Sequence, residues 1–164
     1  MVNTADNPKA LISGFRLSHE MLADSISQIH LSLRSYAQAK PKLRELYNNL
    51  YNHFGRQDSK LYESLSLLFV DDRPALKMLE FLTHDLKDLK IKHLIFYDQH
   101  SGEMGAGHPK SFPVEFSEFA SQILARVKIE EEYLFPLIAK LPAAPGGKKP
   151  AESADFPESG EIGQ

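Results

Sequence analysis

The chain has 164 residues, of which 42% are hydrophobic, and a formal net charge of −3. This size and composition fit a single soluble domain, and the weak charge indicates neither nucleic acid nor a membrane surface as a partner. The sequence contains no cysteine, which excludes disulfides, thiolate metal ligands and a cysteine nucleophile. No apolar run reaches the roughly 18 residues that cross a bilayer, and no export signal is evident after Met1, so we expect a cytoplasmic protein.

The first predicted helix covers residues 8–38. Pro8 suits the first turn of a helix, and Asp6 and Asn7 before it can cap the backbone N–H groups of that turn. Apolar residues then recur at steps of three and four, interrupted once by His19: Ile12, Phe15, Leu22, Ile26, Ile29 and Leu33. This spacing forms one narrow stripe, which indicates packing against neighbouring helices.

Two further helices are predicted over residues 41–69 and 73–99. Lys40-Pro41 separates the first from the second, and Asp71-Asp72-Arg73-Pro74 supplies a cap and a start for the third. Residues 100–113 contain three glycines and two prolines, so we expect a loop there.

A fourth helix is predicted over residues 114–141, again with a single apolar stripe. Pro, Gly, Ala, Lys and Glu dominate residues 142–164, so we expect a disordered C-terminal tail. No segment alternates apolar and polar residues with a period of two, so strands are not expected. Long helices joined by short connections predict an all-α, up-down-up-down four-helix bundle over residues 8–141.

Polar residues interrupt these apolar stripes at matching heights. Counting residues from the predicted turns places His19, Gln57, Arg126 and Glu130 near the middle of the bundle, and His53 lies one turn from Gln57 on the same inner face. Buried charges in proteins are almost always paired or metal-bound, and a buried imidazole needs a hydrogen bond or a metal. These five residues are therefore the candidate site.

The second and fourth helices also share a pattern around these residues. In each, a polar residue is followed four positions later by Gln or Glu, and nine positions later by an aromatic residue. The first copy runs from His53 through Gln57 to Tyr62. The second runs from Arg126 through Glu130 to Phe135, within the sequence Leu134-Phe135-Pro136.

Residues 8–141 resemble the hemerythrin-like (HHE cation-binding) superfamily in these motifs. In that family the four helices supply a His, a His-x-x-x-Glu pair, a His, and a His-x-x-x-Glu pair that leads to Leu-Phe-Pro. The resemblance implies metal-ligand roles for His19, His53 and Glu130. Gln57 stands where the family has a bridging carboxylate, and Arg126 stands where it has a histidine.

The third helix offers no clear ligand. His84 has the expected height but points away from the apolar stripe, which makes it a weaker metal candidate, as is Gln57. His93 is on the stripe but lies about 10 Å beyond the ligand layer. The remaining histidines have no ligand spacing and are interpreted as solvated or loop residues: His30, His100 and His108.

Three occupancies of the core follow from this ligand set. The first is a di-iron centre, as the resemblance implies, and the second is a single metal on His19, His53 and Glu130. The third is a metal-free core in which an Arg126–Glu130 ion pair replaces the metal, with hydrogen bonds from Gln57 and the histidines. The amide at Gln57 removes a negative charge and the guanidinium at Arg126 adds a positive one, so the metal-free core is favoured and no cofactor is expected.

Two function classes fit these alternatives. One is an iron-binding carrier or sensor of oxygen, nitric oxide or redox state, as the resemblance implies. The other, which the ligand set favours, is a non-enzymatic module that senses, regulates or signals by binding a protein partner, a small ligand or a second copy. No phosphate-binding glycine loop follows a strand, and no serine nucleophile with an aligned base is evident, so an enzyme is not expected.

Two surface features remain open. Lysines on the second and third helices are interpreted as a solvated face: Lys60, Lys77, Lys87, Lys90 and Lys92. Tyr47 and Tyr51, among Asn48, Asn49 and Asn52, mark either an oligomer or partner surface or ordinary helix packing.

Overall fold

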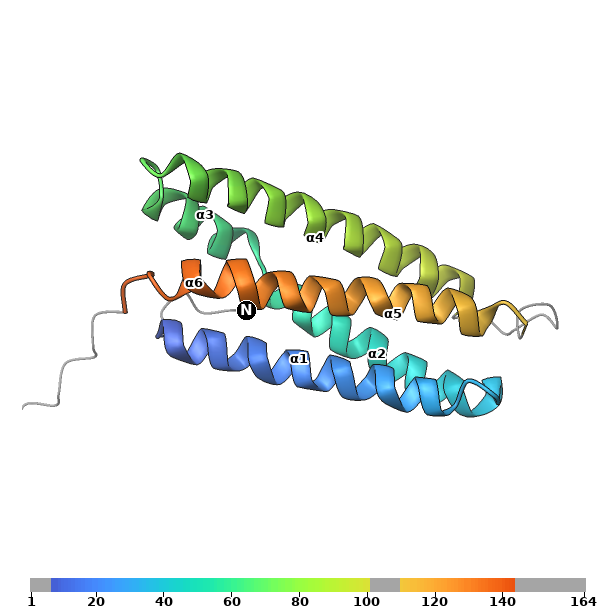
Figure 1. Cartoon of the computed structure of the whole chain (residues 1–164). Helices are drawn as coiled ribbons and strands as arrows, with labels where there is room; N and C mark the ends of the chain where they lie inside the picture. The colour runs from blue at the N-terminus through green and yellow to red at the C-terminus, as the bar shows by residue number, and fades with distance from the viewer. Residues whose placement is uncertain (1–6, 101–109, 144–164) are drawn as a thin grey trace, which may run out of the picture.

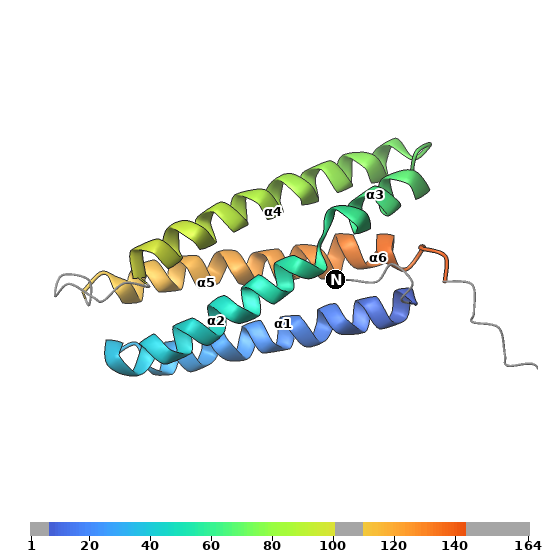
Figure 2. The same cartoon turned by 180° about the vertical axis from the view of Figure 1, so that it is seen from behind.

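The computed structural model describes residues 7–100 and 110–143, and throughout these ranges it is an all-α bundle without strands. Four long helical segments lie side by side in both views (Figures 1 and 2). The turn between α1 and α2 lies at the same end as the close of α4 and the start of α5. The turn between α3 and α4 lies at the other end, near α6 (Figure 1). None of the helices in the described ranges has the length and hydropathy needed to cross a bilayer. The tail predicted over residues 142–164 falls largely outside the described residues.

The first helix, α1 (Pro8–Leu31), begins as the sequence predicts. The Asn7 side chain accepts a hydrogen bond from the Lys9 backbone N–H at 3.0 Å, and Pro8 occupies the first turn. The predicted end at residue 38 is wrong, because backbone turns at Ser32 and Leu33 close the helix at Leu31. The Lys42 ammonium donates to the Ser32 hydroxyl at 2.6 Å across this turn.

The second segment consists of α2 (Tyr36–Arg56) and α3 (Ser59–Leu68). The prediction that Pro41 starts this segment is wrong, since α2 begins at Tyr36 and contains Pro41. Pro41 lies in the second turn of α2, so its missing N–H removes only one helical hydrogen bond. The predicted continuity to residue 69 is also wrong. The chain turns at Gln57, and the Asp58 carboxylate caps α3 by accepting from the Leu61 N–H at 2.9 Å.

The third segment, α4 (Arg73–His100), agrees with the prediction to within one residue. Asp72 accepts a hydrogen bond from the Ala75 N–H at 3.0 Å and caps the helix, as its position indicates. The helix extends one residue further than expected and buries His100, which is 1% exposed. Interpreting His100 as a solvated or loop residue is therefore wrong. It lies seven residues after His93 and continues the inner face of α4.

The fourth segment starts at α5 (Phe112–Ile129), so the predicted loop at 100–113 is too long by two residues at this end. It then widens into η1 (Glu130–Leu134), a π-helical turn, before a short α6 (Phe135–Ile138). In η1 the Phe135 N–H donates to the Glu130 carbonyl, five residues back. Pro136 has no N–H to donate to the Glu132 carbonyl, which removes a competing α-helical bond at this point.

The hydrophobic core is divided into two clusters. One cluster contains Leu22, Leu50, Phe54, Leu86 and Ile123, and it lies towards the α1–α2 turn. The other contains residues that lie further towards the α3–α4 turn: Phe15, Leu61, Leu82, Leu134 and Phe135. In the first, second and fourth segments the polar candidates of the site lie between the two clusters.

Candidate functional site

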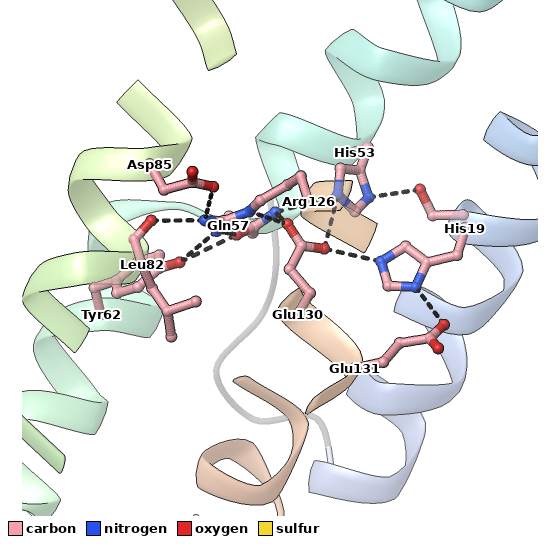
Figure 3. Close-up of polar contacts among 10 residues, drawn as sticks. His19, His53, Gln57, Tyr62, Leu82, Asp85, Arg126, Glu130 and Glu131 are labelled. Carbon is pink, nitrogen blue, oxygen red and sulfur yellow. Dashed lines mark hydrogen bonds and ion pairs between the residues drawn. The ribbon is translucent and has the colours of Figure 1, made fainter. Parts of the chain in front are cut away.

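A buried polar layer separates the two hydrophobic clusters. It contains all five candidate residues, none of which is more than 4% exposed: His19, His53, Gln57, Arg126 and Glu130. They come from α1, the end of α2, α5 and η1, and Figure 3 shows them converging from these elements. The structure thus brings together the side chains that the sequence placed at one height.

Glu130 is the centre of the layer. One of its oxygens, Oε2, lies 2.8 Å from His19 Nε2 and 3.0 Å from His53 Nε2. The other, Oε1, accepts from Gln57 Nε2 at 2.7 Å and from Arg126 Nε at 2.6 Å (Figure 3). The carboxylate is fully buried, and four donors satisfy its lone pairs.

Arg126 uses all five of its N–H groups. In addition to Glu130, the guanidinium donates at 2.8–3.3 Å to four oxygens: Leu82 O, Asp85 Oδ2, Gln57 Oε1 and Tyr62 Oη. The Asp85 carboxylate is half-buried and gives Arg126 a second ion pair, at 2.9 Å. A planar guanidinium with five bonds of fixed direction is held in one orientation, so Arg126 ties α5 to α3 and α4.

Gln57 has the one amide orientation that this layer accepts. Its Nε2 faces Glu130, while its Oε1 accepts from Arg126 at 2.8 Å and from the Tyr62 hydroxyl at 3.1 Å. A carboxylate at position 57 would point an oxygen at the Glu130 carboxylate, and the two would repel unless a cation lay between them. The amide at position 57 therefore suits a core without a bridging metal.

The two histidines differ in their second partners. His53 Nδ1 contacts the Ser18 hydroxyl at 2.9 Å, whereas His19 Nδ1 lies 2.9 Å from a second carboxylate, that of Glu131. The 3.0 Å approach of His53 Nε2 to Glu130 requires a proton on Nε2, which the Ser18 hydroxyl supports by donating to Nδ1. With carboxylates at both ring nitrogens, His19 is suited to be an imidazolium.

The electrostatics follow from these contacts. Burial opposes ionisation of Glu130, but hydrogen bonds from His19 and His53 and the charge of Arg126 hold the pKa of this carboxyl far below its usual range. Burial also opposes the charged form of His19, and its hydrogen bonds to Glu130 and Glu131 outweigh it, so the His19 pKa is raised. The layer therefore holds a carboxylate between a guanidinium and a histidine whose protonated form is favoured.

Two adjacent glutamates at the start of the wide turn η1 contact opposite nitrogens of one histidine. Successive residues of a regular α-helix point 100° apart, so Glu130 and Glu131 would not both face α1. Both glutamates lie in the π-helical turn, and Phe135 directly after it stacks on His19 with ring centroids 5.6 Å apart. Glu131 was missed in the sequence because its role depends on this turn.

The residues present fit one metal ion better than two. His19, His53 and Glu130 offer ligand atoms that all lie within 4.8 Å of one another, and no other such group of three occurs in the described residues. An ion there would have to displace the protons on both Nε2 atoms, in a layer that already holds the Arg126 charge. A second ion would lack ligands, because Gln57 is engaged as an amide and His84 lies exposed on α4.

The other histidines lie outside the polar layer. His93 is buried among aromatic rings at the level of the first cluster, and His100 Nε2 lies 2.9 Å from a carboxylate oxygen of Glu115. His30 is exposed, with its ring against Phe116, and His108 lies outside the described residues. Tyr47 and Asn49 are buried in helix packing, whereas Tyr51 is exposed. Sequence reasoning also missed Tyr62 and Asp85 as partners of Arg126, since neither interrupts an apolar stripe.

The raised pKa of His19 predicts a pH dependence of stability. Because the pKa is above 6.5 in the folded protein, the imidazolium stabilises the fold fully below pH 6.5, and this contribution is lost as the pH rises through the folded pKa. Glu131→Gln will lower the His19 pKa, which NMR titration of the imidazole signals measures. Glu132→Gln is the matched control, since the sequence neighbour Glu132 is exposed and makes no contact with His19. An unchanged His19 pKa in Glu131→Gln would contradict the contact.

No known protein family, no curated protein and no solved structure matches this chain.

Proposed function

We propose that this chain is a hemerythrin-like, up-down-up-down bundle with a degenerate metal site, and that it works as a sensing, regulatory or partner-binding module. One observation carries the proposal. The carboxylate of Glu130, which the resemblance makes a metal ligand, is saturated by four protein donors, and one of them is the fixed charge of Arg126.

The charges of the layer support this proposal. A di-iron site requires bridging carboxylates and neutral imidazoles around at least four positive charges. Here a single buried carboxylate, Glu130, faces a permanent guanidinium and a histidine whose pKa is raised. The guanidinium of Arg126 supplies the positive charge that the metal ions would otherwise provide.

The same layer gives little support to catalysis. A catalytic acid, base or nucleophile must reach a substrate. Glu130 and His53 are at most 1% exposed, and every polar atom of the Arg126 side chain is bonded within the protein. We therefore propose a structural role for the layer, with function residing in surfaces and cavities outside it.

A second candidate function is an iron-binding carrier or sensor of oxygen, nitric oxide or redox state. The observation in its favour is the convergence of His19, His53 and Glu130. A single ion on these three residues would keep coordination positions for a small molecule, as open metal sites do.

Metal analysis separates the two candidates. Protein purified without chelator is expected to contain iron and zinc far below stoichiometric amounts and to show no charge-transfer band in its visible spectrum. One metal per chain that is lost in His19→Ala would support the second candidate. Two metals per chain would contradict both the ion-pair core and the single-ion site.

A further inference from the structure

A second group of buried polar atoms lies between α2 and α4, away from the polar layer. His93 on α4 is 9% exposed, and its Nδ1 has no hydrogen-bond partner within residues 7–100 and 110–143. The hydroxyl of Tyr47 on α2 is likewise buried and unpartnered within those ranges. The two rings meet edge to face, with centroids 5.5 Å apart. Buried polar atoms in proteins are nearly always bonded, so these two atoms are exceptions that call for an explanation.

His93 also lines a cavity of about 870 Å³, together with Phe54, Lys90 and Leu94. This volume lies within the range of about 300–1,000 Å³ that small-molecule sites occupy. The exposed side chains of Leu94 and of Tyr51 on α2, which are 63% and 77% exposed, add apolar surface to its lining. The cavity therefore combines apolar surface from Met21, Phe54 and Leu94 with polar and charged side chains.

Lys90, together with Arg56, gives this cavity a positive charge. It lies three residues before His93 on α4, a spacing that puts both side chains on one face of the helix. Its ammonium sits 5.8 Å from the centre of the Phe54 ring and forms no ion pair in the described part of the chain. Lys90 also lines a neighbouring cavity of about 690 Å³ between α3 and α4. A negatively charged group in either cavity would find this lysine available.

We propose that the cavity between α2 and α4 binds a small aromatic carboxylate, with the carboxylate held by Lys90 and His93 and the ring packed against Phe54 and Leu94. Lys90 and the imidazole N–H of His93, which both line the cavity, act as the donors to the carboxylate. The rings of Tyr51 and Phe54 line the cavity and suit a flat ligand. This site would give the proposed sensing or regulatory module a ligand, but it uses none of the residues of the polar layer. It therefore holds whether or not that layer takes a metal.

Benzoate is the probe for this site, and benzamide is its neutral counterpart of nearly equal shape. Titration of the full chain with benzoate is expected to shift the NMR signals of the His93 ring, assigned by their loss in His93→Phe. The same titration should raise the His93 pKa, which burial lowers in the ligand-free protein, because a nearby carboxylate favours the imidazolium. Benzamide is expected to bind about tenfold more weakly, since it lacks the charge.

Matched lysine variants test the assignment. Lys90→Met should weaken benzoate binding about tenfold, whereas Lys92→Met, which removes the same charge from an exposed position that lines neither cavity, should leave it unchanged. His93→Phe keeps the ring packing and should abolish the preference for benzoate over benzamide. It should also raise the melting temperature of the ligand-free protein, because a buried unbonded nitrogen is removed. Equal affinity for benzoate and benzamide, equal effects of the two lysine variants, or unmoved His93 signals would each overturn the proposal.

Discussion

Arg126→Ala is expected to destabilise the protein by about 3–5 kcal/mol at neutral pH, the usual cost of breaking a buried ion pair from one side. The reason is that Glu130 remains fully buried after its guanidinium partner is gone. Gln57, Tyr62 and Asp85 also lose a donor, so the loss extends to α3 and α4. Urea unfolding followed by circular dichroism measures the change in free energy of unfolding.

Two further variants test whether the loss of stability comes from the unpaired charge of Glu130. Arg126→Ala combined with Glu130→Gln should cost less than Arg126→Ala alone, because no bare charge stays in the core. Arg44→Ala is the matched control, since Arg44 is an exposed arginine on α2 and should change stability little. Near-zero coupling between positions 126 and 130 in a double-mutant cycle would show that the ion pair does not contribute as the geometry indicates.

The pH dependence of the Arg126→Ala effect has a definite sign. The pKa of Glu130 is depressed in the folded protein, so its ionised form contributes stability above the unfolded pKa, and this is lost as the pH falls through the folded value. Without Arg126 the folded pKa should rise. Wild type should therefore lose more stability in acid than the variant does, and the gap between them should narrow as the pH falls.

Gln57→Glu combined with Arg126→His is expected to convert the layer into a metal site. The pair of changes adds a carboxylate and an imidazole beside His19, His53 and Glu130 and removes the fixed positive charge. Changing a group that only contacts a metal ligand typically alters metal affinity by about 10–100-fold. The double variant changes two candidate ligands themselves, so its gain in affinity for iron or zinc should exceed that range. Isothermal titration of the metal-stripped proteins measures the affinity.

The single variants show whether the added carboxylate at position 57 or the removed charge at position 126 contributes more to metal affinity. Gln57→Glu alone places two carboxylates side by side, with only Arg126 and the histidines to offset them, so it should lose stability and gain little affinity. Arg126→His alone removes the competing charge but leaves the amide in place. If wild type binds either metal as tightly as the double variant, the argument that Arg126 opposes metal binding is wrong.

The sequence predicted the main features of the fold because the apolar stripes and caps are strong local signals. Asn7 and Asp72 cap the helices they were expected to cap. The errors occur where tertiary packing overrides a local rule. Pro41 is tolerated inside α2 because only one helical bond is lost. At Gln57, in turn, the chain leaves the helix while keeping its side chain in the polar layer.

The site was predictable for a different reason. A polar residue that interrupts an apolar stripe must be buried, and five such residues at one height imply contact. The same logic could not find Glu131, Tyr62 or Asp85, since these lie at the border of the bundle and look like surface residues in sequence. The contacts of Tyr62 and Asp85 depend on the reach and direction of the Arg126 guanidinium, which spacing alone does not give.

The π-helical turn Glu130–Leu134 also bears on how the length of the chain can vary. A bond that spans five residues encloses one more residue than the α-helical bond does. Deleting Glu132 would convert this turn into regular α-helix, and α5 and α6 would each keep the same side towards the core. A one-residue deletion within α5 would instead rotate the rest of the fourth segment by about 100° about the helix axis. Single-residue insertions and deletions are therefore accommodated here more readily than elsewhere in the fourth segment, at the expense of the double contact of His19 with Glu130 and Glu131.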